Sequence, residues 1–274
     1  MLDKPAIFGL LFLVFHTHVF CASPEKTFVL LVRGEFEERF ENNEILAFNT
    51  LSSLGIPESQ IYVVSPFFSF PGRSDYNSDG TKDVDYPLSF ENVERAIGEI
   101  GRIIPSDGQF LIYLNSHGSR SGFFGLSGND SYIILNTGTR NIPFPEYIYG
   151  EDLDRLVSQY ISPTIEVVLI VQACKSGGFK NTFLKPNRLV ITAAAINNSS
   201  HGGYIDGKEW SRFSYSFFTA IGEWMRNDSE IYETAKMRGN AIPPSTLEEI
   251  TLGYQDTPEI HFGSENMKQT RLGE

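Results

Sequence analysis

Cysteine is scarce in this sequence, because only Cys21 and Cys174 among its 274 residues are cysteines. It also has no run of Lys and Arg, and its formal net charge is −12. Nucleic acids and anionic membrane surfaces attract clustered positive charge, so neither is an expected partner of this chain. The acidic balance is typical of a well-solvated surface and identifies no partner by itself.

A long apolar segment is also missing, except near the amino terminus. Lys4 precedes an apolar stretch at residues 6–15, and small residues follow at Ala22 and Ser23. This layout predicts a secretory signal peptide over residues 1–22, because the apolar run is shorter than the about 20 residues that cross a bilayer as a helix. An uncleaved membrane anchor is the alternative.

Removal of the signal peptide would leave residues 23–274 as one domain, secreted or held in another extracytoplasmic compartment. The net charge would stay at −12, because Asp3 and Lys4 leave together. The mature chain would have no membrane-spanning segment. Cys174 would be its single thiol, so no internal disulfide could form, and that thiol is either a reactive group or a chance cysteine.

Short apolar runs alternate with helical patterns along the mature chain, without internal repeats. Such alternation predicts an α/β fold of about six mostly parallel strands with helices on both faces. With 41% hydrophobic residues, the chain can fill one sizeable core. The expected strands are residues 28–32, 60–64, 110–114, 167–171 and 189–193. The expected helices are residues 41–54, 89–100, 151–160, 213–225 and 231–238.

Two polar motifs follow directly after buried strands. His117 and Gly118 come after the strand at 110–114, and Cys174 comes after the strand at 167–171. Ligand sites of parallel sheets lie at the carboxyl ends of the strands, so we expect His117 and Cys174 to meet if these strands are neighbours. A thiolate attacks carbonyl carbon, and an imidazole can take and return its proton. The main-chain N–H groups of Gly118 and Cys174 are candidates for an oxyanion hole.

Together these motifs resemble the signature of the caspase-like cysteine peptidases, which include caspases, legumains and the catalytic subunit of GPI transamidase. Residues 172–177 read Gln-Ala-Cys-Lys-Ser-Gly, similar to the caspase motif in the glutamine and to the legumain motif in the spacing. Similarity to the legumain family extends over residues 27–226. It includes Gly-Ile-Pro at 55–57, Asp-Val-Asp-Tyr at 83–86 and Thr-Ala-Ala-Ala at 192–195.

The resemblance implies a caspase-like three-layer sandwich and an endopeptidase that acts on peptide or protein substrates. Cys174 would form an acyl-enzyme, His117 would serve as its acid–base partner, and the Gly118 amide would stabilise the oxyanion. One alternative is a transpeptidase or transamidase, in which an amine replaces water at the same residues. Another is an inactive homologue that acts as a binding module.

The resemblance also bears on the substrate pocket. Legumains cleave after Asn, with an arginine on one pocket wall and acidic groups on the other; Arg39 aligns with that arginine, and Arg212 falls at the acidic position. Caspases hold a P1 Asp with two arginines and a glutamine, and Arg39, Gln172 and Arg212 form a similar set. Because Arg binds carboxylates in bidentate fashion, the set implies a preference for Asp, or for Asp over Asn, at P1. A surface salt bridge is the alternative role for each arginine.

Residues 75–83 (DYNSDGTKD) resemble the first part of an EF-hand calcium loop. Oxygen-bearing side chains alternate at Asp75, Asn77 and Asp79, a glycine follows, and Asp83 comes later in the loop. The twelfth position holds Tyr rather than the usual Glu. Calcium binding is therefore one hypothesis and a metal-free polar surface loop is the other. No other cofactor is expected.

Overall fold

Two segments predicted from the sequence, the signal peptide at 1–22 and the helix at 231–238, lie outside the residues that the computed structural model describes. Inside the described parts, every predicted strand and each of the other four predicted helices is present. The described residues are 23–70, 72–120, 130–137, 145–226 and 257–264.

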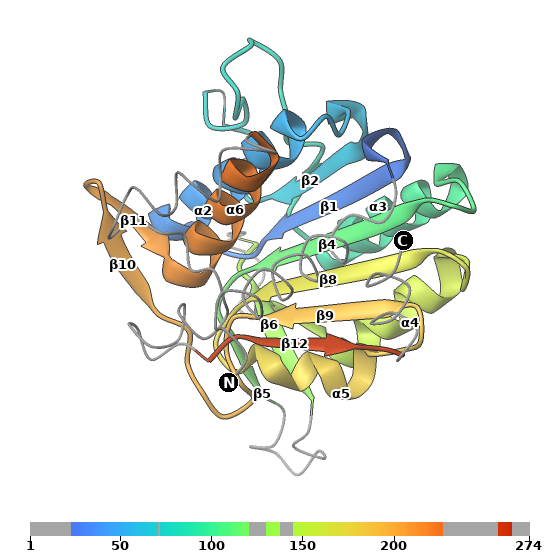
Figure 1. The fold of residues 1–274 in the computed structure, drawn as a ribbon. Coiled ribbons are helices and arrows are strands. Elements are labelled where there is room, and N and C mark those ends of the chain that lie inside the picture. Colours follow the sequence, from blue (N-terminus) through green and yellow to red (C-terminus); the bar gives the residue numbers. More distant parts are fainter. Residues whose placement is uncertain (1–22, 71, 121–129, 138–144, 227–256, 265–274) are drawn as a thin grey trace, which may run out of the picture.

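A seven-stranded sheet lies at the centre of the structure (Figure 1). Its strands are β1 (Thr27–Arg33), β2 (Ile61–Ser65), β3 (Tyr86–Pro87), β4 (Gln109–Asn115), β8 (Glu166–Gln172), β9 (Arg188–Thr192) and β12 (Glu259–Phe262). They are ordered β12-β9-β8-β4-β1-β2-β3, and every neighbouring pair is parallel except β12 with β9. This arrangement confirms the predicted, mostly parallel α/β architecture.

Helices cover both faces of this sheet (Figure 1). They are α2 (Glu38–Ser53), α3 (Phe90–Ile103), α4 (Gly150–Tyr160), α5 (Phe179–Phe183) and α6 (Arg212–Arg226). The helix α3 begins where expected, because Ser89 is its N-cap and the Ser89 side chain accepts a hydrogen bond from the Asn92 N–H. Three layers result, with the sheet between two layers of helices.

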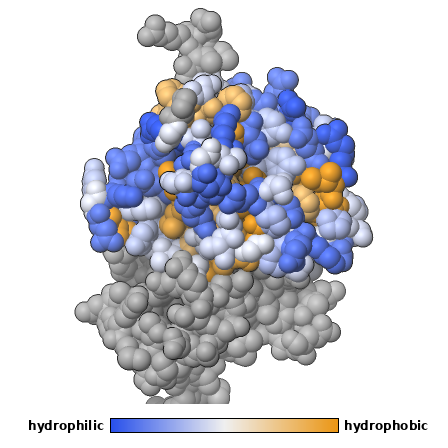
Figure 2. Space-filling model, turned by 90° about the horizontal axis from the view of Figure 1, so that it is seen from above, coloured by the Kyte–Doolittle hydropathy of each residue, from blue (hydrophilic) through white to orange (hydrophobic). Residues whose placement is uncertain are grey.

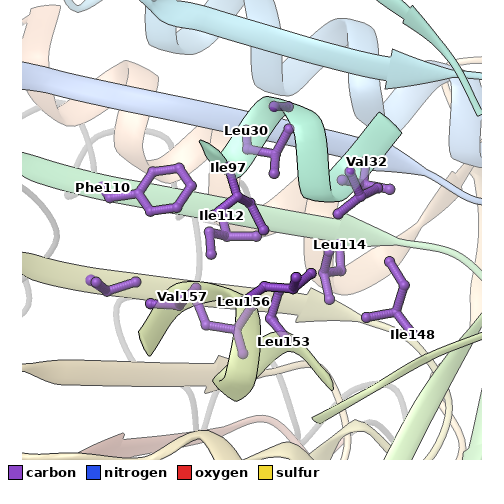
Figure 3. Packing of buried hydrophobic residues seen from close by; sticks show 14 of the residues in the cluster. Leu30, Val32, Ile97, Phe110, Ile112, Leu114, Ile148, Leu153, Leu156 and Val157 are labelled. Carbon is purple, nitrogen blue, oxygen red and sulfur yellow. The ribbon is translucent and has the colours of Figure 1, made fainter. Parts of the chain in front are cut away.

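The core is divided between the two faces because neighbouring strand residues point to opposite sides. Leu30 and Ile112 pack with residues of α3, α4 and α5 on one face, part of which is seen in Figure 3. Leu31 and Tyr113 pack with residues of α2 and α6 on the other face. Each buried Leu or Ile contributes about 1.5–3 kcal/mol through the hydrophobic effect, so the continuous apolar strands account for much of the stability.

Several smaller elements were not expected from the sequence. A three-stranded antiparallel sheet, with its strands in the order β5-β6-β7, lies next to the helix-covered core. A separate antiparallel ribbon pairs two further strands and lies near the carboxyl ends of the central strands (Figure 1). These elements are β5 (Gly118–Arg120), β6 (Ser131–Leu135), β7 (Glu146–Tyr149), β10 (Gly202–Ile205) and β11 (Lys208–Ser211).

The described residues that are visible in Figure 2 are mostly hydrophilic, with a few separate hydrophobic groups. Among the described residues, no helix has both the length and the apolar character needed to cross a membrane.

Candidate active site

Main-chain pairing between β4 and β8 brings the two predicted catalytic segments together. The strands run parallel and in register to their last residues, Asn115 and Gln172. The Ser116 N–H then donates to the Gln172 carbonyl oxygen at 3.1 Å, which extends the pairing by one residue. His117 and Cys174 are each the second residue beyond their strand, so they leave the same edge of the sheet next to each other.

Gly118 lies against the main chain of the predicted nucleophile. A Cβ atom built on this glycine would be 2.8 Å from the Cβ of Ala173 and 3.0 Å from the Cys174 carbonyl oxygen. It would also be 2.7 Å from the Tyr132 carbonyl oxygen. Since two of these contacts are with main-chain atoms, any other residue would force the segments apart. The glycine therefore permits the close approach of the histidine segment to the cysteine.

The thiol of Cys174 is free and partly exposed. Its Sγ donates to the Ser200 carbonyl oxygen at 3.6 Å. The next residue, Lys175, has a φ of +61°, in the left-handed region that costs side-chain-bearing residues free energy. The Lys175 N–H donates to the Asn198 carbonyl oxygen at 2.8 Å. Residues 198–200 therefore form one wall beside the sulfur.

Glu37 is a direct partner of His117 that the sequence analysis did not identify. Its Oε1 lies 2.7 Å from Nε2 of the imidazole. Burial raises the pKa of the Glu37 carboxyl, but the hydrogen bond with His117 and the charge of Arg39 together bring that pKa below its usual range. Because the two side chains are 46% and 38% exposed, solvent screens their attraction. The contact therefore orients the imidazole more than it stabilises the fold.

Glu35 is a second carboxyl close to the imidazole. It is largely buried, and its Oε2 accepts a hydrogen bond from Asn136 Nδ2 at 3.1 Å. Burial raises the pKa of Glu35, although the Asn136 amide and the charge of His117 act in the opposite direction. The site thus contains one carboxyl with a lowered pKa and one with a raised pKa.

Arg39 completes the group around the imidazole. Its Nε donates to Glu37 Oε2 at 2.9 Å, and its Nη2 lies 3.3 Å from Nε2 and 3.4 Å from Nδ1 of His117. The guanidinium carbon is 4.4 Å from the centre of the Phe40 ring, and the same ring meets the imidazole edge-on at 5.2 Å. Arg39 therefore stands beside the catalytic candidate, with Glu37 balancing its charge.

The two predicted pocket arginines both contact β10. A Cβ built on Gly202 would be 3.2 Å from Nη1 of Arg39, and a Cβ built on Gly203 would be 2.7 Å from Nε of Arg212. Neighbouring strand residues point to opposite faces. The two guanidinium groups therefore approach the same strand from opposite sides, and each is in contact with a glycine.

Gln172, the third predicted pocket residue, is buried at the end of β8. Its Nε2 donates to Ser200 Oγ at 2.7 Å, and its Oε1 accepts from the Ser214 hydroxyl at 3.2 Å. Tyr113 continues this buried chain, with its hydroxyl 2.6 Å from Ser214 Oγ. The Gln172 amide thus supports the wall beside the sulfur, and its contact with a substrate stays a prediction.

The proposed calcium loop uses its side-chain oxygens on its own main chain. Asp75 Oδ2 accepts from the Gly80 N–H at 3.0 Å, and Asn77 Oδ1 accepts from the Asp79 N–H, also at 3.0 Å. Asp83 Oδ2 accepts from the Tyr76 N–H. Within the described residues, no three His, Cys, Asp or Glu side chains are grouped so that they could hold a metal ion. Calcium binding therefore stays a prediction.

Glu35, Glu37 and Ser200 are site residues that the sequence analysis did not identify as such. A signal for Glu37 existed, since it follows β1 at the same edge of the sheet where polar residues were sought after other strands. No comparable signal existed for Ser200, because its main-chain carbonyl, which any residue carries, contacts the sulfur. Only the folded chain could show that contact.

Comparison with protein-family models matches residues 75–267, more than half of the chain, to the Peptidase C13 family. The matched region includes His117 and Cys174, whereas Glu37 and Arg39 precede it. A comparison with curated proteins gave no match.

Proposed function

The chain belongs to the peptidase C13 family, the legumain family, and from this premise we propose that it is a cysteine endopeptidase with Cys174 as nucleophile and His117 as acid–base partner. Membership supports a cysteine peptidase or transamidase activity on peptide or protein substrates. The observation that carries the assignment of residues is the in-register pairing of β4 with β8, which delivers His117-Gly118 and Cys174 to one edge of the sheet.

In the proposed reaction, His117 takes the thiol proton as the Cys174 sulfur bonds to the substrate carbonyl carbon. The Gly118 and Cys174 N–H groups donate to the oxyanion that forms. The carbon–nitrogen bond then breaks, and the imidazolium returns its proton to the leaving amine. Water attacks the resulting thioester, which releases the acid product and restores the thiol and the imidazole.

Glu37 gives the imidazole a defined tautomer in this proposal. With a proton on Nε2 directed to Glu37 Oε1, the other nitrogen, Nδ1, carries the lone pair and would act as the base. The carboxylate also stabilises the imidazolium as it forms. Glu37 is thus a positioning residue that acts through His117.

We further propose that the substrate residue at P1 is Asp, or Asn as the second choice. The positions of two cations support this proposal. Arg39 lies beside the imidazole of His117, and Arg212 lies against β10, the strand that follows Ser200. Arg39 and Arg212 are both candidates for a P1 carboxylate, because a guanidinium group can bind a carboxylate through two parallel hydrogen bonds. Gln172 would support the residues beside the sulfur through its hydrogen bond to Ser200.

Two further proposals concern the surroundings of the enzyme. The pattern of residues 1–22 supports export of the chain by a cleaved signal peptide. The DYNSDG sequence at residues 75–80 supports a calcium-binding loop. A rise in melting temperature with calcium that disappears in Asp79→Ala is the expected result for the loop, and an unchanged melting temperature would remove the calcium proposal.

The decisive experiment is to measure hydrolysis of fluorogenic peptides that differ only at P1, together with labelling by an acyloxymethylketone probe. Wild type is expected to cleave after Asp faster than after Asn, and Cys174→Ala should abolish both hydrolysis and labelling. Faster cleavage after Asn or Lys would refute the P1 proposal. An unlabelled, inactive wild type would instead identify a binding module. Product analysis with an added amine separates hydrolysis from transamidation, since only the latter incorporates the amine.

A further inference from the structure

A row of buried polar side chains lies under the proposed site. Arg33, Asn115 and Gln172 are the last residues of β1, β4 and β8, and the pairing register sets them side by side. All three are at most 3% exposed. Polar groups at such positions are costly unless they find hydrogen-bond partners. Arg33 forms an ion pair with Glu44 of α2, and Gln172 forms hydrogen bonds with two serines. Asn115, the residue between them in the row, also needs hydrogen-bond partners.

Asn115 belongs to a chain of buried amides that joins three elements. Its Nδ2 donates to the Phe40 carbonyl oxygen at 2.7 Å, and its Oδ1 accepts from Asn43 Nδ2 at 3.1 Å. The Oδ1 of Asn43 in turn accepts from the Ser211 N–H at 3.1 Å. Asn43 is fully buried, so water cannot replace either partner. The amides connect β4, the start of α2 and the end of β11.

Apart from Asn43, the residues joined by these hydrogen bonds lie within two positions in the sequence of residues of the proposed site. Asn115 precedes His117 by two residues, Phe40 follows Arg39, and Ser211 precedes Arg212. The Phe40 ring also contacts the imidazole of His117 directly. The distances between the imidazole and both arginines therefore depend on the same buried hydrogen bonds.

We propose that Asn43 is a specificity-determining positioning residue, which holds the elements carrying Arg39 and Arg212 at a set distance from His117. The proposal rests on the proposed peptidase function. Asn43 donates through one end of its amide and accepts through the other. An ionised Asp lacks the donor and Ala lacks both groups, so neither could maintain this series of hydrogen bonds. The expected consequence of its loss is weaker substrate binding, since the nucleophile itself is held by main-chain pairing.

The test compares Asn43→Asp with Asn43→Ala and with the control Asn49→Ala. Asn49 is on the same helix and donates to the Tyr76 carbonyl oxygen at 3.0 Å, but it contacts no residue of the site. Both Asn43 variants should raise KM for a P1 Asp peptide at least about tenfold, the equivalent of one hydrogen bond with a charged or buried partner. Alkylation of Cys174 by iodoacetamide should stay within about twofold of wild type, because β4 and β8 still place the thiol.

A pH profile distinguishes positioning from a general structural defect. When protonated, the carboxyl introduced by Asn43→Asp can donate to Asn115 while still accepting from Ser211. Burial raises the pKa of such a carboxyl, so KM of Asn43→Asp should recover toward the wild-type value as the pH is lowered from 8 to about 5. Asn43→Ala should show no recovery. The charged and titratable groups on or beside the connected elements include Arg33, Arg39, Glu44, His117 and Arg212. They are the same in both Asn43 variants, so the difference between these variants isolates the new carboxyl.

The possible outcomes separate the positioning role from the peptidase function. Recovery in Asn43→Asp alone, with a normal KM in Asn49→Ala, supports the positioning role. Equal KM values in Asn43→Asp, Asn49→Ala and wild type overturn it while leaving the peptidase proposal intact. A wild type that cleaves no peptide and reacts with no active-site probe overturns the peptidase function, and the positioning role with it.

Discussion

The two halves of the proposed site are held in different ways. His117 and Cys174 follow strands whose main chains pair in register, so their neighbourhood is set by the sheet itself. Glu37 is the N-cap of α2, Arg39 lies in α2 and Arg212 begins α6. Side-chain contacts connect these elements to the sheet. Most substitutions leave main-chain hydrogen bonds intact, whereas replacement of a side chain removes the contacts that this side chain makes. We call His117 and Cys174 the nucleophilic half, and Glu37, Arg39 and Arg212 the recognition half. Most substitutions elsewhere should leave the positions in the nucleophilic half unchanged, whereas single substitutions should alter the recognition half.

The largest effect on activity is expected from a substitution next to His117, in the nucleophilic half. Gly118→Ala places a Cβ within 3.0 Å of the Cys174 carbonyl oxygen and should displace an oxyanion donor. Loss of such a donor lowers kcat by about 100-fold or more. The measurement is kcat for the preferred P1 peptide, with melting temperature as a check on folding.

Gly98→Ala is the matched control, because a Cβ on that helical glycine would meet only the Tyr160 ring at 3.5 Å, an ordinary contact. It should leave kcat unchanged. A Gly118→Ala protein that folds and keeps wild-type kcat would show that the close approach does not matter for catalysis.

The next largest effect on activity is expected from loss of the contact between Glu37 and His117, which connects the two halves. Glu37→Ala removes the partner of His117 Nε2 and should lower kcat/KM by about 10- to 100-fold. This is less than the about 100- to 10,000-fold that an acid–base group itself contributes, because His117 is still present. Glu37 is at the N-cap of α2 but makes no side-chain capping bond, so helix stability should change little. Glu38→Ala, which removes the same charge from the neighbouring residue, should be near wild type.

The pH dependence of the Glu37 effect follows from its lowered pKa. A carboxyl whose pKa is lower when folded than its unfolded value of about 4.3 is ionised and effective above that value, and the benefit is lost as the pH falls through the folded pKa. The ratio of wild-type to Glu37→Ala activity should thus be constant from pH 5 to 7 and shrink below about pH 4. A ratio that declines near pH 6 would contradict this assignment.

A smaller and more selective effect is expected in the recognition half. Gly202→Ala and Gly203→Ala disturb one arginine each, Arg39 and Arg212 respectively. Each variant should reduce the Asp-to-Asn preference at P1 by about tenfold, the value of a charged hydrogen bond. The measurement is the ratio of kcat/KM for the two peptides. An unchanged ratio in both variants would refute a role of these two arginines at P1.

The smallest effect should come from the strained residue after the nucleophile. Lys175 adopts a φ of +61°, so Lys175→Gly relieves strain while adding freedom to the unfolded chain. The free energy of unfolding, measured in urea, should rise by at most about 1 kcal/mol. Labelling of Cys174 should stay within about twofold. A clear loss of stability would mean that the Lys175 side chain contributes more through its contact with Asn197 than the strain costs.

Much of the fold could be predicted because the strands β1, β4 and β8 are continuous apolar runs, which suit only a sheet covered on both faces. The ribbon formed by β10 and β11 could not, since its residues contain two glycines and charged side chains and carry little strand signal. The strand β12 was missed for a similar reason. Its four residues are short and half-polar, and only pairing with β9 makes them a strand.

The sequence by itself determined the nucleophilic half of the site. Apolar periodicity defines the strands, and the residues two positions beyond two of them, His117 and Cys174, must leave from the carboxyl edge of a parallel sheet. The tertiary structure alone decided the partners of these residues. Glu37 meets His117, and Asn43 meets Asn115, across about 70–80 positions of chain, and such contacts depend on how helices pack against the sheet rather than on any local pattern.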